Sequence, residues 1–258
     1  MPTSTSLQVE REGRVLRLTL SRPDKRNALS AELCHAIVAA IESAAGDSTV
    51  GAVLVGAQGN VFCAGMDLTE IGGDDAPELT AIHERLFTLG LRVAVPIVMA
   101  VRGPALGGGV GLLANGHIVV AAQGATFALS EIRIGMWPFV IFGALAVAIG
   151  ERRALALSLT GRVFSVQEAL QWGLVHEIAQ AVEVEDRAHA VAQHLASLSR
   201  PTIRAGLKFA NETRDQDHVA AASAAARYRA AAFASADFAE GVRAFREKRA
   251  PRWPSLGE

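Results

Sequence analysis

Hydrophobic and polar positions along the first part of the chain predict two strands, a helix and a further strand. Residues 7–10 and 14–20 alternate with the two-residue period of strands. Ser30 precedes a segment in which apolar residues recur every three to four positions, as in a capped helix with one buried face. Residues 51–57 are apolar almost throughout, which is typical of a buried strand. The chain therefore opens with a ββαβ unit.

Helical periodicity dominates the later part of the chain. Residues 79–91 predict a helix with an apolar face, and Ser165 with Glu168 forms a capping box that opens another. Helices are also expected over residues 183–199, from Pro201 onward, and over the alanine-rich residues 218–245. The Gly- and Asp-rich residues 70–78 are expected to form a mobile loop.

Two glycine turns each follow an apolar strand. One contains the triplet Gly107–Gly109, and the other contains Gly65 just before a helix start expected at Asp67. Such turns leave backbone N–H groups unpaired, among them that of Met66, and two of these donors can stabilise one enolate or tetrahedral oxygen. Close packing of two elements explains a glycine triplet equally simply.

A dinucleotide site is a competing interpretation of the same stretch. The run from Gly109 through Gly111 to Ala114 fits the pattern G-x-G-x-x-A, and Glu131 follows about twenty residues on, where a ribose-binding acid is expected. The pattern lies in the middle of the chain, however, and it gives the Gly65 turn no purpose.

Composition excludes several classes of function. The chain has 258 residues, of which 50% are hydrophobic and 20% charged, with a formal net charge of -1. No basic patch favours nucleic acid, and no apolar run is long enough to span a membrane. Two cysteines, a polar N-terminus without a signal-peptide pattern, and few His or Cys at ligand spacing predict a cytoplasmic protein without a metal site.

Four motifs together resemble the enoyl-CoA hydratase/isomerase (crotonase) family in order and spacing. They are SRPDKRNAL at 21–29, FCAGMDL at 62–68, AVRGPALGGG at 100–109 and WGLV at 172–175, and the resemblance extends over about residues 7–251. It implies an α/β fold in which residues 1–196 form a spiral of ββα units that binds acyl-CoA. It also implies a helical region over residues 197–258 that assembles homotrimers or dimers of trimers. Coenzyme A would enter as part of the thioester substrate, with no separate cofactor.

The resemblance also implies roles for individual residues. The backbone N–H groups of Met66 and Gly108 would form an oxyanion hole, with Gly107 and Gly111 beside the substrate. The CoA adenine and phosphates would be bordered by Lys25, Arg26, Ala28, Ala64, Asp67 and Leu68. Phe245 and Lys248 match a C-terminal motif whose lysine reaches CoA phosphate, in some members from a neighbouring subunit. An exposed lysine in a basic tail is the alternative.

The carboxylates bear on the type of reaction. Family hydratases use two glutamates; the first position is Gly111 here, and the second is Glu131, the one acid between Glu84 and Glu151. A carboxyl group in apolar surroundings has a raised pKa, which suits proton transfer near neutral pH. An ion pair with Arg133, on the same face if the segment is extended, is the alternative.

A single carboxylate favours isomerisation over hydration. One base, Glu131, can remove a proton from C2 of a 3-enoyl-CoA and return it at C4, whereas hydration needs one group for water and another for the proton. An enoyl-CoA hydratase with a divergent site and a catalytically silent acyl-CoA-binding trimer remain as alternatives. Trp137 and Phe139 stand where the family often has smaller residues, so they either narrow the acyl pocket or belong to the core.

Overall fold

The computed structural model describes residues 5–70 and 76–257, so part of the loop expected over residues 70–78 lies outside the described residues. Its main sheet has six strands in the order β1-β2-β3-β4-β6-β9, with β1 and β2 antiparallel and the later neighbours parallel. The strands are β1 Leu7–Glu12, β2 Val15–Leu20, β3 Ala52–Ala57, β4 Ile97–Val101, β6 Ile118–Ala122 and β9 Glu177–Ala179. A smaller sheet joins β5 Ala105–Leu106, β7 Thr126–Ala128 and β8 Val163–Ser165.

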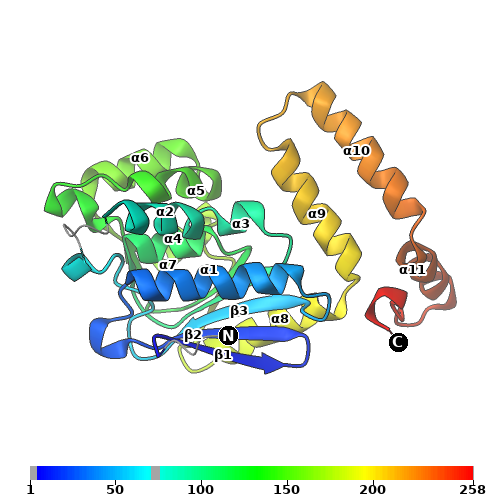
Figure 1. The fold of residues 1–258 in the computed structure, drawn as a ribbon, viewed down its shortest axis with the longest axis horizontal. Helices are drawn as coiled ribbons and strands as arrows, with labels where there is room; N and C mark the ends of the chain where they lie inside the picture. The colour runs from blue at the N-terminus through cyan, green and yellow to red at the C-terminus, as the bar shows by residue number, and fades with distance from the viewer. Residues whose placement is uncertain (1–4, 71–75, 258) are drawn as a thin grey trace.

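Helices cover the main sheet and build a second layer above it (Figure 1). The helix α1 packs on β1, β2 and β3, while α8 packs against β3, β4 and β6. The helices α2, α4, α5 and α6 form the layer beyond α1, in which α2 packs on α1, α4 packs on α5, and α5 packs on α6. These helices are α1 Ala31–Gly46, α2 Ala76–Leu86, α3 Leu89–Arg92, α4 Gly108–Ala114, α5 Phe139–Ile149, α6 Glu151–Thr160, α7 Val166–Trp172 and α8 Val184–Ser197.

Local capping chemistry explains several element boundaries. The predicted ββαβ opening is confirmed, and the side chain of Ser30 accepts a hydrogen bond from Leu33 N–H at the start of α1. The capping box of Ser165 and Glu168 is confirmed at the start of α7, which ends at Gly173 in the left-handed conformation. Of the helix expected from Asp67, the structure describes the short 3-10 turn η2 Leu68–Glu70, and residues 71–75 lie outside the described residues.

The C-terminal residues form an arm of helices that extends away from the core (Figure 1). It contains α9 Arg200–Thr213, α10 His218–Phe233 and α11 Ala236–Glu247. The helical span predicted over residues 218–245 is confirmed except for a break at Ala234 and Ser235, which the prediction did not include. The Ser235 side chain accepts from Phe238 N–H, which caps a new helix and explains the break. The boundary predicted at residue 196 falls in the last turn of α8.

Buried hydrogen bonds connect the end of the chain to the start of the arm. Asp237, only 4% exposed, accepts from the hydroxyl of Ser199 at 2.5 Å and from that of Ser255 at 2.6 Å. These bonds fix the end of the chain, including the 3-10 turn η4 Pro254–Leu256, against α11. Within residues 5–70 and 76–257, no helix has the length and apolar character needed to cross a membrane.

Candidate active site

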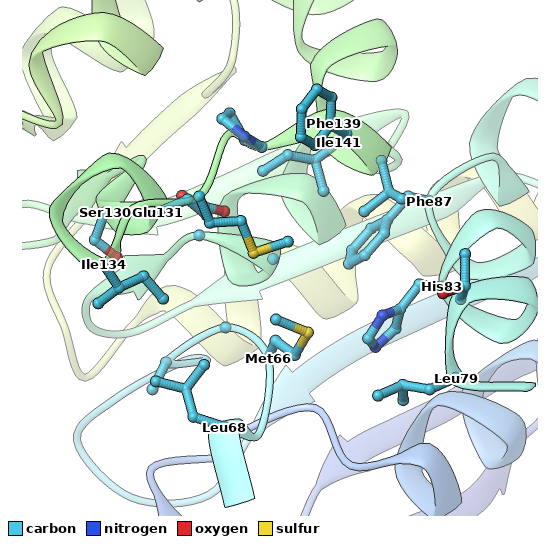
Figure 2. A pocket seen from close by; sticks show the side chains of 18 of the residues that line it. Met66, Leu68, Leu79, His83, Phe87, Ser130, Glu131, Ile134, Phe139 and Ile141 are labelled. Carbon is cyan, nitrogen blue, oxygen red and sulfur yellow. The ribbon is translucent and has the colours of Figure 1, made fainter. Parts of the chain in front are cut away.

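A cavity of about 470 Å³ lies where α2, the start of α4, the 3-10 turn η3 Ser130–Ile134 and the start of α5 meet (Figure 2). Most of its lining is apolar, and the charged groups in it are few. The lining consists of Ala64, Gly65, Met66, Leu68, Leu79, Thr80, His83, Phe87, Gly107, Gly108, Ser130, Glu131, Arg133, Ile134, Met136, Pro138, Phe139, Val140 and Ile141.

Backbone pairing holds the two glycine turns side by side at the floor of this pocket. Cys63 forms an isolated parallel bridge with Ala105, and Leu106 N–H donates to the carbonyl oxygen of Cys63 at 2.9 Å. A second parallel bridge joins Met66 to Leu29. Two segments that are distant in the sequence therefore form one local structure.

The close approach of the turns requires glycine at position 65. Gly65 has a φ of +93°, and a Cβ atom added there would lie 2.9 Å from the carbonyl oxygen of Leu106 and 3.3 Å from the nitrogen of Gly108. In the described part of the chain, the N–H groups of Met66 and Gly108 donate no hydrogen bond. Two unpaired donors in adjacent turns can bind a single oxygen atom.

Glu131 extends from η3 to the same turn. Its Oε1 lies 2.9 Å from the position that a Cβ atom of Gly107 would occupy, so the carboxylate packs directly on the glycine backbone. Its Oε2 is buried and has no hydrogen-bond partner among the described residues. Burial raises the pKa of Glu131 above its usual range. The structure thus places a carboxylate with one unpaired oxygen against Gly107, one residue before the N–H group of Gly108.

Arg133 does not pair with Glu131, so the alternative based on an extended segment is wrong. The segment is a 3-10 helix, in which residues two apart do not share a face. The Arg133 side chain instead donates to the carbonyl oxygen of Gly161 at 2.7 Å. Glu131 consequently has no compensating cation from its own turn.

Gly111 lies behind the pocket wall and is not part of the lining. A Cβ atom at this position would lie 2.4 Å from Ile141 Cγ2 and 3.0 Å from Phe87 Cδ1. Since both neighbours are buried, position 111 has no room for a carboxylate side chain. Gly109 is equally close-packed, with its added Cβ 2.4 Å from the carbonyl oxygen of Cys63. The glycines of the dinucleotide pattern therefore serve helix packing inside α4.

The residues expected at the CoA side lie in two adjoining loops. Lys25 and Arg26 are exposed beside the 3-10 turn η1 Pro23–Lys25, and Ala64 N–H donates to the carbonyl oxygen of Arg26 at 3.0 Å. The carbonyl oxygen of Ala28 accepts from the Arg22 guanidinium at 2.6 Å. Of the six residues in this set, Ala64 and Leu68 line the pocket.

Asp67 has a structural role in its own loop and joins that loop to the segment that contains Arg22. Its carboxylate pairs with Arg22 at 3.0 Å and accepts from the Thr69 hydroxyl at 2.7 Å. The hydrogen bonds from Thr69 and then from Arg22 hold the pKa of Asp67 below its usual range. The side chain is 7% exposed and does not line the pocket.

Three further predicted residues lie outside the pocket. The Trp137 ring packs against Phe142 with their centroids 6.0 Å apart, whereas its neighbour Phe139 lines the pocket. Phe245 is 84% exposed on α11, and Lys248 is the exposed left-handed cap of the same helix. Within one subunit, the arm does not bring Phe245 or Lys248 to the pocket lining.

His83 is a pocket residue that the sequence interpretation missed. It lies on α2 between Leu79 and Phe87, four residues from each, so the three share one helix face toward the pocket. The Nε2 atom of His83 is buried without a hydrogen-bond partner among the described residues, and burial lowers its pKa. The helical spacing within residues 79–91 was the available indication, because it sets a histidine on an otherwise apolar stripe.

Two other kinds of chemistry receive no support from the described residues. Burial raises the pKa of the Cys63 thiol to about 12, which keeps it protonated and unreactive. No group of three or more His, Cys, Asp or Glu side chains within residues 5–70 and 76–257 is arranged to hold a metal ion.

Comparison with known proteins assigns the chain to a family. A family profile described as enoyl-CoA hydratase/isomerase matches residues 10–255. The chain belongs to the enoyl-CoA hydratase/isomerase family. Family members of known structure share its architecture: an enoyl-CoA hydratase of Mycobacterium smegmatis superposes with a TM-score of 0.92 at 30% identity, covering 97% of this chain and 100% of that one. The predicted crotonase-like α/β fold is confirmed, and the C-terminal region is helical.

Curated relatives of this family member are named after both hydratases and an isomerase. Enoyl-CoA hydratase domain-containing protein 3 of Danio rerio is 31% identical over 99% of this chain and 90% of its own length. The 1,2-epoxyphenylacetyl-CoA isomerase of Escherichia coli is 32% identical over 93% of this chain and 94% of its own length. The family thus fixes an acyl-CoA enzyme of the hydratase/isomerase type but not the reaction.

Proposed function

We propose that this enzyme isomerises enoyl-CoA thioesters by a proton transfer on Glu131. The carboxylate removes a proton from C2 of a 3-enoyl-CoA and returns it at C4. The N–H groups of Met66 and Gly108 donate to the thioester oxygen as negative charge develops on it. The observation that carries this proposal is that, among the described residues, Glu131 is the one carboxylate in the pocket lining, with no room for another at Gly111.

The electrostatics of the pocket support this chemistry. A desolvated, unpaired carboxylate is a stronger base than one in water, and it lies beside the proposed oxyanion hole. Fixed backbone donors require no reorganisation when the dienolate forms, which is why such donors lower barriers effectively. The transfer needs no metal and no cofactor besides the CoA of the substrate.

We further infer that the CoA moiety lies along the loop of Lys25, Arg26 and Ala28, and that the active form is a homotrimer or a dimer of trimers. Lys25 and Arg26 are exposed cations suited to phosphate groups. In such an assembly, Phe245 and Lys248 of one subunit reach the CoA of another. The cytoplasmic location expected from the sequence stays a prediction.

The decisive experiment compares two substrates and one substitution. Purified enzyme is mixed separately with a 3-enoyl-CoA and a 2-enoyl-CoA, and the products are separated by chromatography. We expect rapid isomerisation of the former and slow or absent hydration of the latter. Glu131→Gln should lower kcat by about 10²- to 10⁴-fold, the usual contribution of a general base, with little change in the Kd for a saturated acyl-CoA.

Glu151→Gln is the matched control, because Glu151 is an exposed carboxylate at the start of α6. It should retain the activity of the unmodified enzyme. Hydration faster than isomerisation would overturn the isomerase assignment, and full turnover by Glu131→Gln would remove Glu131 from the mechanism.

A further inference from the structure

The wall of the pocket opposite Glu131 contains a polar atom that the proposed proton transfer does not use. His83 is 5% exposed, and its Nε2 has no hydrogen-bond partner in the part of the chain that the structure describes. Its neighbours along the helix face, Leu79 and Phe87, offer only apolar side chains to the pocket. Figure 2 shows the imidazole directed into the pocket toward Met66.

A buried nitrogen without a hydrogen-bond partner costs free energy. Two other histidines have such a nitrogen, but they differ from His83 in their position. The Nε2 atoms of His117 and His189 are also buried without a partner among the described residues, but neither residue lines the pocket. Only at His83 can a ligand in the pocket supply the missing hydrogen bond. A polar group that is satisfied only in the complex favours ligands that carry its partner over those that lack it.

The position of His83 indicates which part of the ligand it meets. Glu131 packs on Gly107, whereas the Phe87 ring lies on the other side of the triplet, 3.1 Å from the position of a Gly108 Cβ. His83 lies on the same side as Phe87, and the centroids of the two rings are 5.9 Å apart. Figure 2 shows Glu131 on one side of the pocket and Phe87 and His83 on the other, so we expect a thioester held at Gly108, with its C2 toward Glu131, to direct its acyl group past Phe87 toward His83.

The protonation state of His83 suits a neutral oxygen. Burial lowers its pKa, so the ring is uncharged near neutral pH and carries one N–H donor and one acceptor nitrogen. A hydroxyl group can pair with either tautomer at Nε2, and a carbonyl oxygen can pair with the N–H form. A carboxylate would add a second negative charge to a pocket that already contains the desolvated Glu131.

We propose that the acyl group accepted by this site carries a hydroxyl or carbonyl oxygen beyond the reacting carbons, and that Nε2 of His83 hydrogen-bonds to it. The inference rests on the proposed function in so far as the ligand is an acyl-CoA. His83 then selects the substrate, while Glu131 performs the chemistry.

The test measures the Kd of saturated or aryl CoA esters, which lack a double bond to move. One pair is hexanoyl-CoA and 6-hydroxyhexanoyl-CoA, and the other is phenylacetyl-CoA and 4-hydroxyphenylacetyl-CoA. In at least one pair we expect the hydroxylated ester to bind the unmodified enzyme about tenfold more tightly. Equal affinity within both pairs, or preference for the esters without the hydroxyl, overturns the inference.

Variants assign the preference to His83. His83→Leu should remove the preference to within about twofold, because Leu offers no hydrogen bond. His83→Gln should restore part of it, since its amide nitrogen can reach near the former Nε2 position. His35→Leu is the control: His35 is exposed on α1 and pairs with Glu78 at the surface, so the preference should persist. A preference that survives in His83→Leu assigns the selectivity elsewhere and overturns the role of His83.

The outcomes separate this inference from the proposed function. Binding of all four esters without preference contradicts the role of His83 and leaves the isomerase assignment intact. Failure of every ester to bind contradicts both. Turnover of a 3-enoyl-CoA tests the isomerase assignment independently. If His83→Leu fails to fold, the comparison in the unmodified enzyme and in His83→Gln still decides.

Discussion

At the scale of single residues, Glu131 keeps its basicity because it is buried and no cation of the described residues pairs with it. A carboxylate with a cation beside it would be a weak base, and Arg133 is the nearest cation in sequence. The 3-10 geometry of η3 directs Arg133 to the carbonyl oxygen of Gly161 instead. The desolvation that makes Glu131 reactive must also reduce the stability of the folded chain.

This cost predicts how stability depends on pH. Because burial raises the pKa of Glu131 in the folded state, the folded chain holds this proton more tightly than the unfolded chain. The contribution is most favourable below the unfolded pKa, and it is lost as pH rises through the folded pKa. Glu131→Gln should therefore gain stability over the unmodified enzyme on going from about pH 5 to about pH 8.

Urea unfolding at the two pH values measures this difference. The other titratable or charged side chains in the pocket, His83 and Arg133, are present in both proteins and cancel in the comparison. A difference that is independent of pH, or that shrinks as pH rises, would show that Glu131 is not desolvated.

At the scale of elements, two turns from different parts of the chain act as one structural unit. The bridge of Cys63 with Ala105 holds them in register, and the bridge of Met66 with Leu29 joins the Gly65 turn to the segment before α1. Gly65 lies directly against Leu106 and Gly108 of the other turn, so its lack of a side chain determines the placement of the donor at Gly108.

Gly65→Ala should therefore lower activity by displacing this donor. The new Cβ would press against the Leu106 carbonyl, and loss of one donor of this kind costs about 10²- to 10³-fold in kcat. Gly150→Ala is the matched control, because Gly150 also has a positive φ, of +83°, but no atom lies within 4 Å of an added Cβ. It should lose about 1–3 kcal/mol of stability from backbone strain and keep its kcat.

Steady-state kinetics and urea unfolding of both variants separate the two effects. Equal losses of kcat would mean that backbone strain, rather than displacement of the Gly108 donor, lowers the activity of both variants. Normal kcat in Gly65→Ala would show that the Gly108 N–H does not take part in the reaction.

At the scale of the whole molecule, the C-terminal arm of a single subunit keeps large apolar side chains exposed. Helix α10 buries only Ala224 within the described chain, and Val219 and Phe233 on it are 78% and 52% exposed. Exposed apolar surface of this kind marks an interaction surface. We expect a trimer, or a dimer of trimers, formed through this arm.

Light scattering coupled to size-exclusion chromatography tests the assembly. The mass should be three or six times the chain mass of 27.1 kDa. Introducing Val219→Asp and Phe233→Asp together should shift the mass toward one subunit, because two charges would be buried in the contact. Val182→Asp is the control, since Val182 is 88% exposed outside the arm and should leave the mass unchanged. A monomeric unmodified chain would contradict the assembly.

Local sequence rules determined much of this molecule. Strand alternation predicted β1 and β2, and the caps at Ser30 and Ser165 predicted the starts of α1 and α7, because these features depend on residues close together in the chain. Four motifs in fixed order also identified the family. The missed break at Ser235 shows the limit, since an alanine-rich run satisfies helical propensity on both sides of it.

Only the tertiary structure decided which groups lie in contact with each functional residue. Whether Glu131 was paired, and that Gly111 has no room for a carboxylate, depended on Arg133, Ile141 and their placement across the fold. The position of His83 in the pocket and the ion pair of Asp67 with Arg22 also depend on the tertiary structure. Burial and hydrogen bonding arise between segments distant in sequence, so no local pattern encodes them.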